Sequence, residues 1–183
     1  MPLFDLPAQN EPLEAELKEA FERVLRSSRF ILGDEVEQFE AHMSQTLEVK
    51  HAIGVSSGTD ALLLALMTLG IGPGDEVLCP AFTFFATAGS IARVGATPVF
   101  CDVCPVCFNL NPHDAEKRIT KNTKAIIPVH LFGQAAAMDP LLDLARAHNL
   151  RVIEDCAQAL GATYKDRQVG TMGDFAAHSF FPT

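Results

Sequence analysis

The sequence has no tryptophan, a single tyrosine and few basic residues. Its 183 residues include 14 lysines and arginines against 23 aspartates and glutamates, which gives a formal net charge of −9. Nucleic acids and anionic membranes are bound by basic surfaces, so this balance argues against both as partners. An acidic surface also favours solubility, and the charge by itself therefore points to no particular ligand.

Long apolar runs are missing as well. The longest apolar stretch begins at Ala61 and is too short to cross a bilayer. Residues 1–5 lack the basic start and the long apolar core of a signal peptide. We therefore expect a cytoplasmic protein whose five cysteines are reduced thiols. The length is sufficient for a substantial core without disulfides or metals.

From residue 51 onward, short apolar runs alternate with helical patterns. The runs predict strands at Ala52–Val55, Glu76–Cys79, Thr97–Cys101, Ala125–Val129, Arg151–Glu154 and Phe175–Phe180. The segments between them predict helices at Ala61–Leu69, Phe85–Val94, His113–Ile119 and Pro140–His148. This alternation is typical of an α/β fold with a mostly parallel, doubly wound sheet and helices on both faces.

Helix starts are marked by capping residues. Asn111-Pro112 and Asp139-Pro140 each place a capping side chain before a proline at the first helical position. Before residue 51 the pattern predicts two helices, Glu14–Leu25 and one that Asp34 begins with a capping box. We expect residues 1–50 to form an N-terminal helical segment and residues 51–183 to form the α/β domain. The apolar loop 30–33 between the helices is expected to pack on another surface, such as a second subunit.

One strand-to-helix junction has the composition of a phosphate site. Ser56–Asp60 follows the first expected strand and opens an apolar helix. Gly58 allows close approach of the backbone, the hydroxyls of Ser57 and Thr59 can donate, and the helix dipole favours an anion. The alternative is an ordinary capped turn, since serine, glycine and threonine are common turn residues.

Two further strand ends carry chemically suitable side chains. Asp155 follows Val152–Glu154, and a carboxylate there can pair with a protonated pyridine nitrogen of pyridoxal phosphate. Gln158 is close enough in sequence to reach the ring hydroxyl. Phe84 follows another strand and could stack on a cofactor ring. Taken singly, Asp155 is better explained as a turn cap and Phe84 as a core residue.

Three other motifs are better explained without a ligand. Cys101, Cys104 and Cys107 have a spacing found in iron–sulfur sites, but no fourth cysteine follows. No metal site is therefore expected. Residues 70–74 imitate a dinucleotide loop but follow a helix, which predicts a helix end and turn. His130 is interpreted as a hydrogen-bonded residue at a strand end.

Taken together, the motifs resemble the DegT/DnrJ/StrS family of nucleotide-sugar aminotransferases, which have the large domain of fold type I pyridoxal phosphate enzymes. The matching stretches cover nearly the whole chain in order: Gly33–Glu40, Ser56–Leu62, Gly72–Val77, Thr83–Ala86, Ala125–Gly133, Val152–Ala159 and Ser179–Thr183. The resemblance implies that the turn Gly58-Thr59-Asp60 and Ser179 hold the cofactor phosphate. It also implies that Phe84 stacks on the ring, that Asp155 pairs with the pyridine nitrogen and that Gln158 lies near the ring oxygen.

In this family the Schiff-base lysine would occupy position 184, directly after Thr183. We expect a lysine carrying covalent pyridoxal phosphate there, followed by the rest of the large domain and a small C-terminal domain. The intact protein would then have about twice the 19.8 kDa of this sequence. Members are homodimers with active sites completed by the second subunit, and the same is expected here.

The resemblance implies a two-stage amino transfer from an amino-acid donor, glutamate by family likeness, to a nucleotide-linked keto sugar. Amino-sugar and surface-polysaccharide biosynthesis is the expected context. Amination at C3 is slightly favoured over C4 by residues 30–33. The rivals are a dehydratase relative with histidine at position 184, which Thr183 disfavours, and a non-catalytic module that binds pyridoxal phosphate. A nicotinamide-dependent dehydrogenase is the weakest rival, because no glycine fingerprint joins a strand to a helix.

Overall fold

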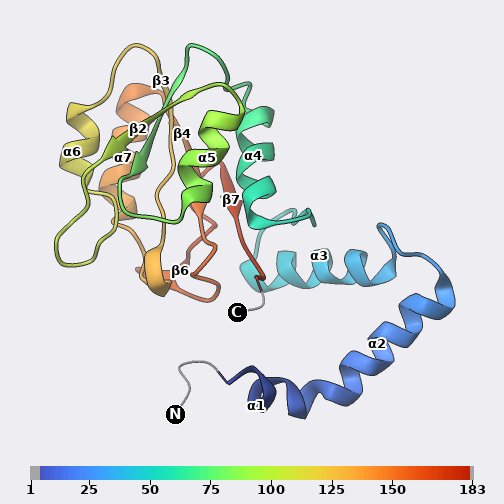
Figure 1. Cartoon of the computed structure of the whole chain (residues 1–183). Coiled ribbons are helices and arrows are strands. Elements are labelled where there is room, and N and C mark those ends of the chain that lie inside the picture. The colour runs from blue at the N-terminus through green and yellow to red at the C-terminus, as the bar shows by residue number, and fades with distance from the viewer. Residues whose placement is uncertain (1–4, 182–183) are drawn as a thin grey trace. The chain divides into compact units, whose positions relative to one another are not determined.

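The computed structural model describes residues 5–181 (Figure 1). Residues 1–4 and 182–183, including the Thr183 that disfavours the dehydratase, lie outside the described residues. The chain divides into two compact units, residues 5–54 with Phe181, and Val55–Phe180. The predicted domain boundary at residue 50 stays a prediction. No described helix is both long and apolar enough to cross a membrane.

The first unit is helical. It contains α1 (Leu6–Asn10), the 3-10 turn η1 (Glu11–Leu13), α2 (Glu14–Ser27) and α3 (Asp34–Leu47). On α2, side chains four residues apart form the ion pairs Lys18–Glu14 and Arg26–Glu22, which support an exposed helix locally. The prediction that Asp34 caps α3 was wrong. Gly33 occupies the cap position, and Asp34 forms an ion pair with Arg29.

The second unit is built around a five-stranded sheet in the order β2-β1-β3-β4-β7, with every adjacent pair parallel. The strands are β1 (Glu76–Pro80), β2 (Thr97–Cys101), β3 (Thr123–Ile126), β4 (Arg151–Asp155) and β7 (Phe175–Ala177). The helices are α4 (Gly58–Thr68), α5 (Phe85–Arg93), α6 (Pro112–Lys117) and α7 (Met138–His148). A short turn η2 (Leu131–Gly133) and a hairpin of β5 (Thr163–Tyr164) and β6 (Arg167–Gln168) complete it.

Two apolar cores cover the two faces of this sheet, as Figure 1 shows by the separation of α4 and α5 from α6 and α7. On one face, Leu62 and Leu66 of α4 and Ile91 of α5 pack against Val77 and Ile153 of the strands. The opposite core contains different residues of the same strands together with α6 and α7: Leu78, Ile126, Val152, Ala115, Met138, Leu141 and Leu144. Adjacent strand residues thus contribute to opposite cores, which confirms the doubly wound α/β prediction.

Two further local predictions were wrong. Residues 52–55 form no strand, and Ile53 is 79% exposed, because no other described strand pairs with this segment. Helix α7 begins at Met138 with Ala137 at its cap, so Asp139 lies in the first helical turn, where it pairs with Lys165. By contrast, Asn111 caps α6 as predicted, since its side chain accepts a hydrogen bond from the amide of His113 at 3.0 Å.

Candidate active site

The chain reverses its direction across the sheet between β1 and β3. From β1 it moves to β2 at one edge, then returns past β1 to β3 and continues to β4 and β7. In open parallel sheets, ligands bind outside the carboxyl ends of the strands near such a reversal. The segments that follow β1 and β3 carry Phe84 and His130, and β4 itself ends at Asp155, so three of the sequence-selected positions belong to this edge.

Asp155 ends β4 and is buried, with 5% of its surface exposed. Its backbone is fixed on both sides, because its amide donates to Pro128 at 2.8 Å and its carbonyl accepts from His130 at 3.0 Å. One carboxylate oxygen accepts from Thr87 Oγ1 at 2.9 Å and the other from the Ala157 amide at 3.2 Å. The carboxylate therefore has a defined direction before any ligand is present.

The Asp155 carboxylate has a raised pKa. Burial raises its pKa above the ordinary value of 3.8, and the hydrogen bonds from Thr87 and Ala157 only partly offset this. Twelve ion pairs occur within residues 5–181, and none of them involves Asp155. A buried carboxylate without a cation gains most from a positively charged partner.

The start of α4 has the donors that an anion needs. Ser57 caps the helix, since its hydroxyl accepts from the Asp60 amide at 3.1 Å. The amides of Gly58 and Thr59 make no hydrogen bond with any described residue. Two free amides at the positive end of a helix dipole form a ready site for phosphate.

Gly58 is required by a close approach of the chain. A Cβ at this position would lie 2.8 Å from Ser179 Cβ and 3.3 Å from the carbonyl oxygen of His178. Ser179 follows β7, so the start of α4 and the end of β7 are in contact. This brings Ser179 to the free amides of α4, as the phosphate prediction requires.

Helix α5 links the anion site to the buried carboxylate. Its Ser90 hydroxyl donates to the Thr59 carbonyl at 3.2 Å, and its Thr87 hydroxyl donates to Asp155. Thr87 and Ser90 are three residues apart, which is one turn of the helix. A molecule with an anionic group at one end and a protonated nitrogen at the other could contact both places.

The predicted place of Asp60 in the anion site stays a prediction, and in this structure its amide and carboxylate already have partners within the chain. Its carboxylate accepts a hydrogen bond from the Ser56 hydroxyl and lies 3.7 Å from Arg93, and its amide is committed to Ser57. The Ser56 hydrogen bond lowers the Asp60 pKa, with Ser57 and Arg93 acting in the same direction. These contacts stabilise the turn and give no support to Asp60 as a direct ligand of an anion.

Phe84 and Gln158 are exposed side chains in the segments that follow β1 and β4, and we call their position the mouth of the candidate site. Phe84 stands at the cap position of α5 and is 71% exposed, so its ring is available to a ligand. Gln158 Oε1 accepts from the Phe132 amide at 2.9 Å, which fixes the side chain and leaves its NH₂ group without a partner among the described residues. Both geometries are compatible with the predicted contacts to a ring.

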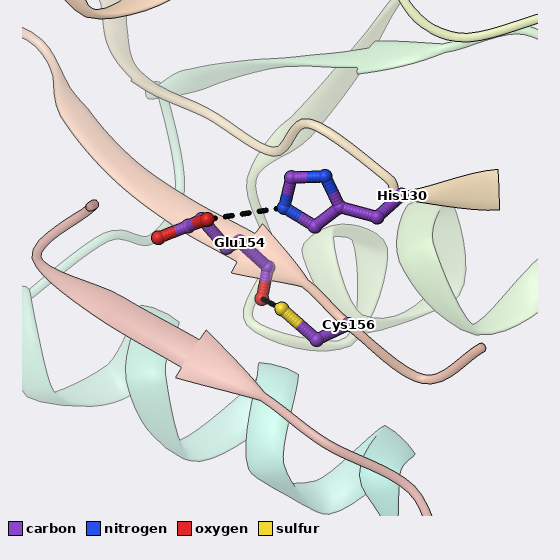
Figure 2. A group of neighbouring side chains, drawn as sticks. All are labelled: His130, Glu154 and Cys156. Carbon is purple, nitrogen blue, oxygen red and sulfur yellow. Dashed lines mark hydrogen bonds and ion pairs between the residues drawn. The ribbon is translucent and has the colours of Figure 1, made fainter. Parts of the chain in front are cut away.

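Behind this edge lies a buried polar cluster of His130, Glu154 and Cys156 (Figure 2). His130 Nε2 lies 3.0 Å from Glu154 Oε2, and His130 Nδ1 accepts from the Ala136 amide at 3.0 Å. The ring proton is therefore on Nε2, from which it is donated to Glu154. This contact confirms the interpretation of His130 as a hydrogen-bonded residue at the end of a strand.

The Glu154 carboxylate also accepts hydrogen bonds from three backbone amides. Those of Met172 and Gly173 lie 2.7 Å from one carboxylate oxygen, and that of Gly170 lies 2.8 Å from the other. Burial acts to raise the Glu154 pKa, but the hydrogen bonds from His130, Gly170, Gly173 and Met172 together lower it. Glu154 thus ties the loop 170–173 to the end of β4.

The cluster has the residue types of a metal site but not the free donors. Both nitrogens of His130 and both oxygens of Glu154 are already hydrogen-bonded. Burial, followed by the nearby carboxylates of Glu154 and Asp155, raises the Cys156 pKa far above its ordinary value, so the thiol stays protonated. A thiolate is the form that binds metal, and the cluster is therefore structural.

Sequence analysis missed Thr87 and Glu154. Thr87 and Ser90 are both buried on the inner face of an otherwise apolar helix, and this spacing of two hydroxyls was a usable signal. Glu154 looked like the last residue of an apolar strand. Its partners come from a loop sixteen or more residues away in sequence, so no local pattern could have indicated its role.

Known proteins match this chain over almost its whole length. The model of the DegT/DnrJ/EryC1/StrS aminotransferase family matches residues 11–183. A pleiotropic regulatory protein of Geobacillus stearothermophilus is 53% identical over the whole chain, which covers 49% of that protein. A UDP-N-acetyl-3-dehydro-α-D-glucosamine 3-aminotransferase of Acidithiobacillus ferrooxidans is 48% identical, again over the whole chain and 50% of its own length.

Solved structures match equally well. DesV of Streptomyces venezuelae, in complex with a ketimine intermediate, superposes with a TM-score of 0.96 at 48% identity, covering 99% of this chain and 49% of that one. Other matching structures, 35–36% identical, are of forms with pyridoxal phosphate or its amine form. This chain thus spans about half the length of the relatives it matches. It belongs to the DegT/DnrJ/EryC1/StrS aminotransferase family.

Proposed function

We propose that the protein containing this chain is a pyridoxal phosphate-dependent aminotransferase that transfers an amino group from an amino acid to a nucleotide-linked keto sugar. The observation that carries the proposal is that one edge of the sheet has both a carboxylate suited to a cation and backbone amides suited to an anion. Asp155 is a buried carboxylate that pairs with no cation of residues 5–181, and the start of α4 offers free amides to an anion. One turn of α5 connects them.

Pyridoxal phosphate fits both groups, since it carries a phosphate and a ring nitrogen that can be protonated. When bound, it supplies an electron sink for bond breaking at the amino carbon. Asp155 would hold a proton on the ring nitrogen, and Thr87 would keep the Asp155 carboxylate pointing at it. The amides of Gly58 and Thr59, with the hydroxyls of Thr59 and Ser179, would bind the phosphate.

The exposed side chains at the mouth complete the proposed site. Phe84 would lie against one face of the ring and exclude water from it. Gln158, held by the Phe132 amide, would donate its NH₂ group to the ring oxygen. Asp60 would act only by fixing the turn through Ser56 and Arg93.

The substrate class follows from the names of the relatives. The Acidithiobacillus relative is named for amination at C3 of a UDP-linked sugar, which supports a nucleotide-linked keto sugar and favours C3 over C4. The dehydratase alternative requires histidine in place of lysine at position 184. Glutamate as the donor remains the family expectation.

We also propose that the protein is a cytoplasmic homodimer. The five cysteines are all free thiols, which suits a reducing compartment. Leu17, Phe21 and Leu25 of α2, and Ile31 in the following loop, are more than half exposed, and a second subunit is the occupant we propose for them. Light scattering of the full-length protein should give twice the mass of one chain.

The function is tested on the full-length protein reconstituted with pyridoxal phosphate. We expect a visible absorption band that borohydride reduces onto a lysine, that glutamate removes, and that a nucleotide-linked 3-keto sugar restores. A band that borohydride does not fix to the protein would support the dehydratase or the non-catalytic module. Loss of the band with glutamate but no reaction with any keto sugar would exclude the proposed substrate class.

A matched pair of variants tests the anion site independently. Thr59→Val removes a hydroxyl at the first turn of α4 and should weaken cofactor binding by about tenfold. Thr68→Val, at the last turn of the same helix, removes a hydroxyl that only bonds to Leu64 and should leave binding unchanged. Equal dissociation constants for the two variants would remove Thr59 from the site.

A further inference from the structure

The five cysteines fall into two classes. Cys79, Cys101 and Cys156 are buried, and burial raises the pKa of the Cys79 and Cys101 thiols to about 12. Cys104 and Cys107 are partly exposed in the loop that follows β2. Only this pair combines accessibility with two thiols at short spacing, and the aminotransferase site does not use it.

The backbone holds the pair in a closed turn. Phe108 donates its amide to the Cys104 carbonyl at 2.8 Å, and Cys104 donates to the Asn109 carbonyl at 2.9 Å. An antiparallel bridge between Val103 and Leu110 closes the loop behind them. In a single helical turn of this kind, residues three apart lie on one side with Cβ atoms about 5–6 Å from each other. A disulfide requires about 3.5–4.5 Å, so a small movement of Cys107 would suffice.

The surroundings of the two sulfurs in this turn differ. The amides of Cys107 and Val106, and then the Cys107 thiol, lower the Cys104 pKa below its ordinary value of 9.0. The first cysteine of a Cys-X-X-Cys turn is activated in this way because the thiolate is the nucleophile in disulfide exchange. Cys104 is thus placed to attack and Cys107 to resolve.

We propose that Cys104 and Cys107 form a thiol–disulfide exchange site that reacts with low-molecular-weight disulfides such as oxidised glutathione. The Cys104 thiolate attacks one sulfur of the small disulfide, whose S–S bond breaks and releases one small thiolate. The Cys107 thiolate then attacks Cys104 Sγ and releases the second. The two protein thiols are oxidised to a disulfide, the small disulfide is reduced to two thiols, and their two protons pass to the released thiolates.

The turn is connected to the segments that form the mouth of the candidate active site. The Phe108 ring packs on Phe82 at 5.8 Å between centroids, two residues before Phe84. Asn109 accepts from the Leu131 amide at 3.0 Å and donates to the Gln134 carbonyl at 2.9 Å. Closure of the disulfide therefore acts on residues next to two loops of the site. The exchange chemistry itself does not rest on the proposed function.

The test uses the full-length protein equilibrated with glutathione at increasing ratios of oxidised to reduced form. After blocking free thiols with N-ethylmaleimide, peptide mass spectrometry should find Cys104 and Cys107 joined while Cys79, Cys101 and Cys156 stay reduced. In the fully reduced protein near neutral pH, Cys104 should be alkylated faster than Cys107. Equal alkylation rates, or no Cys104–Cys107 link at any ratio, would overturn the proposal.

Three variants define the order of attack. Cys107→Ser should stop the reaction at a mixed disulfide between glutathione and Cys104. Cys104→Ser should give no adduct under the same conditions, because it lacks the thiol that attacks the small disulfide. Cys79→Ala, which changes a buried cysteine of β1, should oxidise like the unaltered protein. Adduct formation at Cys107 in Cys104→Ser would contradict the assigned order.

Discussion

Glu154 and Asp155 are neighbours at the end of β4, yet their carboxylates have opposite environments. Because strand side chains alternate, the two groups lie on opposite faces of the sheet. Glu154 accepts hydrogen bonds from His130 and three backbone amides, and its pKa is lowered. Among the described residues, the Asp155 carboxylate accepts only from Thr87 and Ala157, and its pKa is raised.

The difference separates a carboxylate with a structural role from one that is a candidate for function. Burial is nearly complete for both, so burial does not distinguish them. What distinguishes them is the number of partners: Glu154 has hydrogen-bond donors for both carboxylate oxygens and His130 beside it, whereas Asp155 forms no ion pair within residues 5–181. A strongly perturbed group with few partners at a sheet edge is the better candidate for chemistry.

The largest expected effect is on the Glu154 side of the comparison. Glu154→Ala leaves the His130 ring and three amides without an acceptor inside the protein. We expect the free energy of unfolding to fall by about 3–5 kcal/mol, a large share of the stability of a typical domain. Urea unfolding of the full-length protein measures it.

Glu154→Gln is the matched control. It preserves the shape and one acceptor oxygen but points an NH₂ group at amide donors, so the loss should be intermediate. If alanine and glutamine cost the same as a typical surface substitution, the loop 170–173 does not depend on Glu154.

Asp155→Asn should affect catalysis instead of stability. The amide cannot hold a proton on a ring nitrogen, and we expect the rate of the glutamate half-reaction to fall about 100-fold or more. Single-turnover absorbance measurements give this rate. A half-reaction within a factor of a few of the unaltered protein would remove Asp155 from the proposed role.

The same variant gives a pH signature in the cofactor-free protein. Above the ordinary pKa of 3.8, unfolded Asp155 loses its proton while the folded residue keeps it, so stability falls as pH rises toward the raised folded pKa. Asp155→Asn should lack this decline and be the more stable protein at neutral pH. The lowered Glu154 pKa acts in the opposite direction, since its stabilisation is complete above 4.5 and is lost as pH falls through the folded pKa.

Thr87→Val should have the smallest effect of the three. It removes the hydroxyl that donates to Asp155 and that is also hydrogen-bonded to Thr83 Oγ1 at 3.1 Å. The volume of the side chain stays nearly the same. We expect the Asp155 pKa to rise further and cofactor affinity to fall about tenfold. A pH titration of the cofactor absorbance follows both. Thr87→Ser retains the donor and should behave like the unaltered protein.

The fold was predictable where local patterns and burial agree. Apolar runs such as Glu76–Cys79 became buried strands because they lie inside the sheet. The run at residues 52–55 looked the same but failed, since strand formation depends on a paired neighbour that no sequence window contains. The Asp139-Pro140 signal was similarly overridden when α7 began one residue before Asp139.

The site was predictable only in part. Asp155 and the turn at Gly58 were recognisable because a strand end and a helix start are local features. The contact of Gly58 with Ser179 and the hydrogen bond from Thr87 to Asp155 join segments far apart in the chain. Spatial proximity of this kind follows from the sheet order, which the residue pattern does not specify.

The contact between Gly58 and Ser179 also has a consequence for biosynthesis. These residues lie near the two ends of the described α/β unit, Val55–Phe180. During translation Gly58 is therefore made first, and Ser179 is added only after nearly all of this unit has been made. A nascent chain cannot offer the complete anion cradle until β7 has emerged and added to the edge of the sheet. On the proposed function, pyridoxal phosphate would therefore bind at this site only after β7 has joined the sheet.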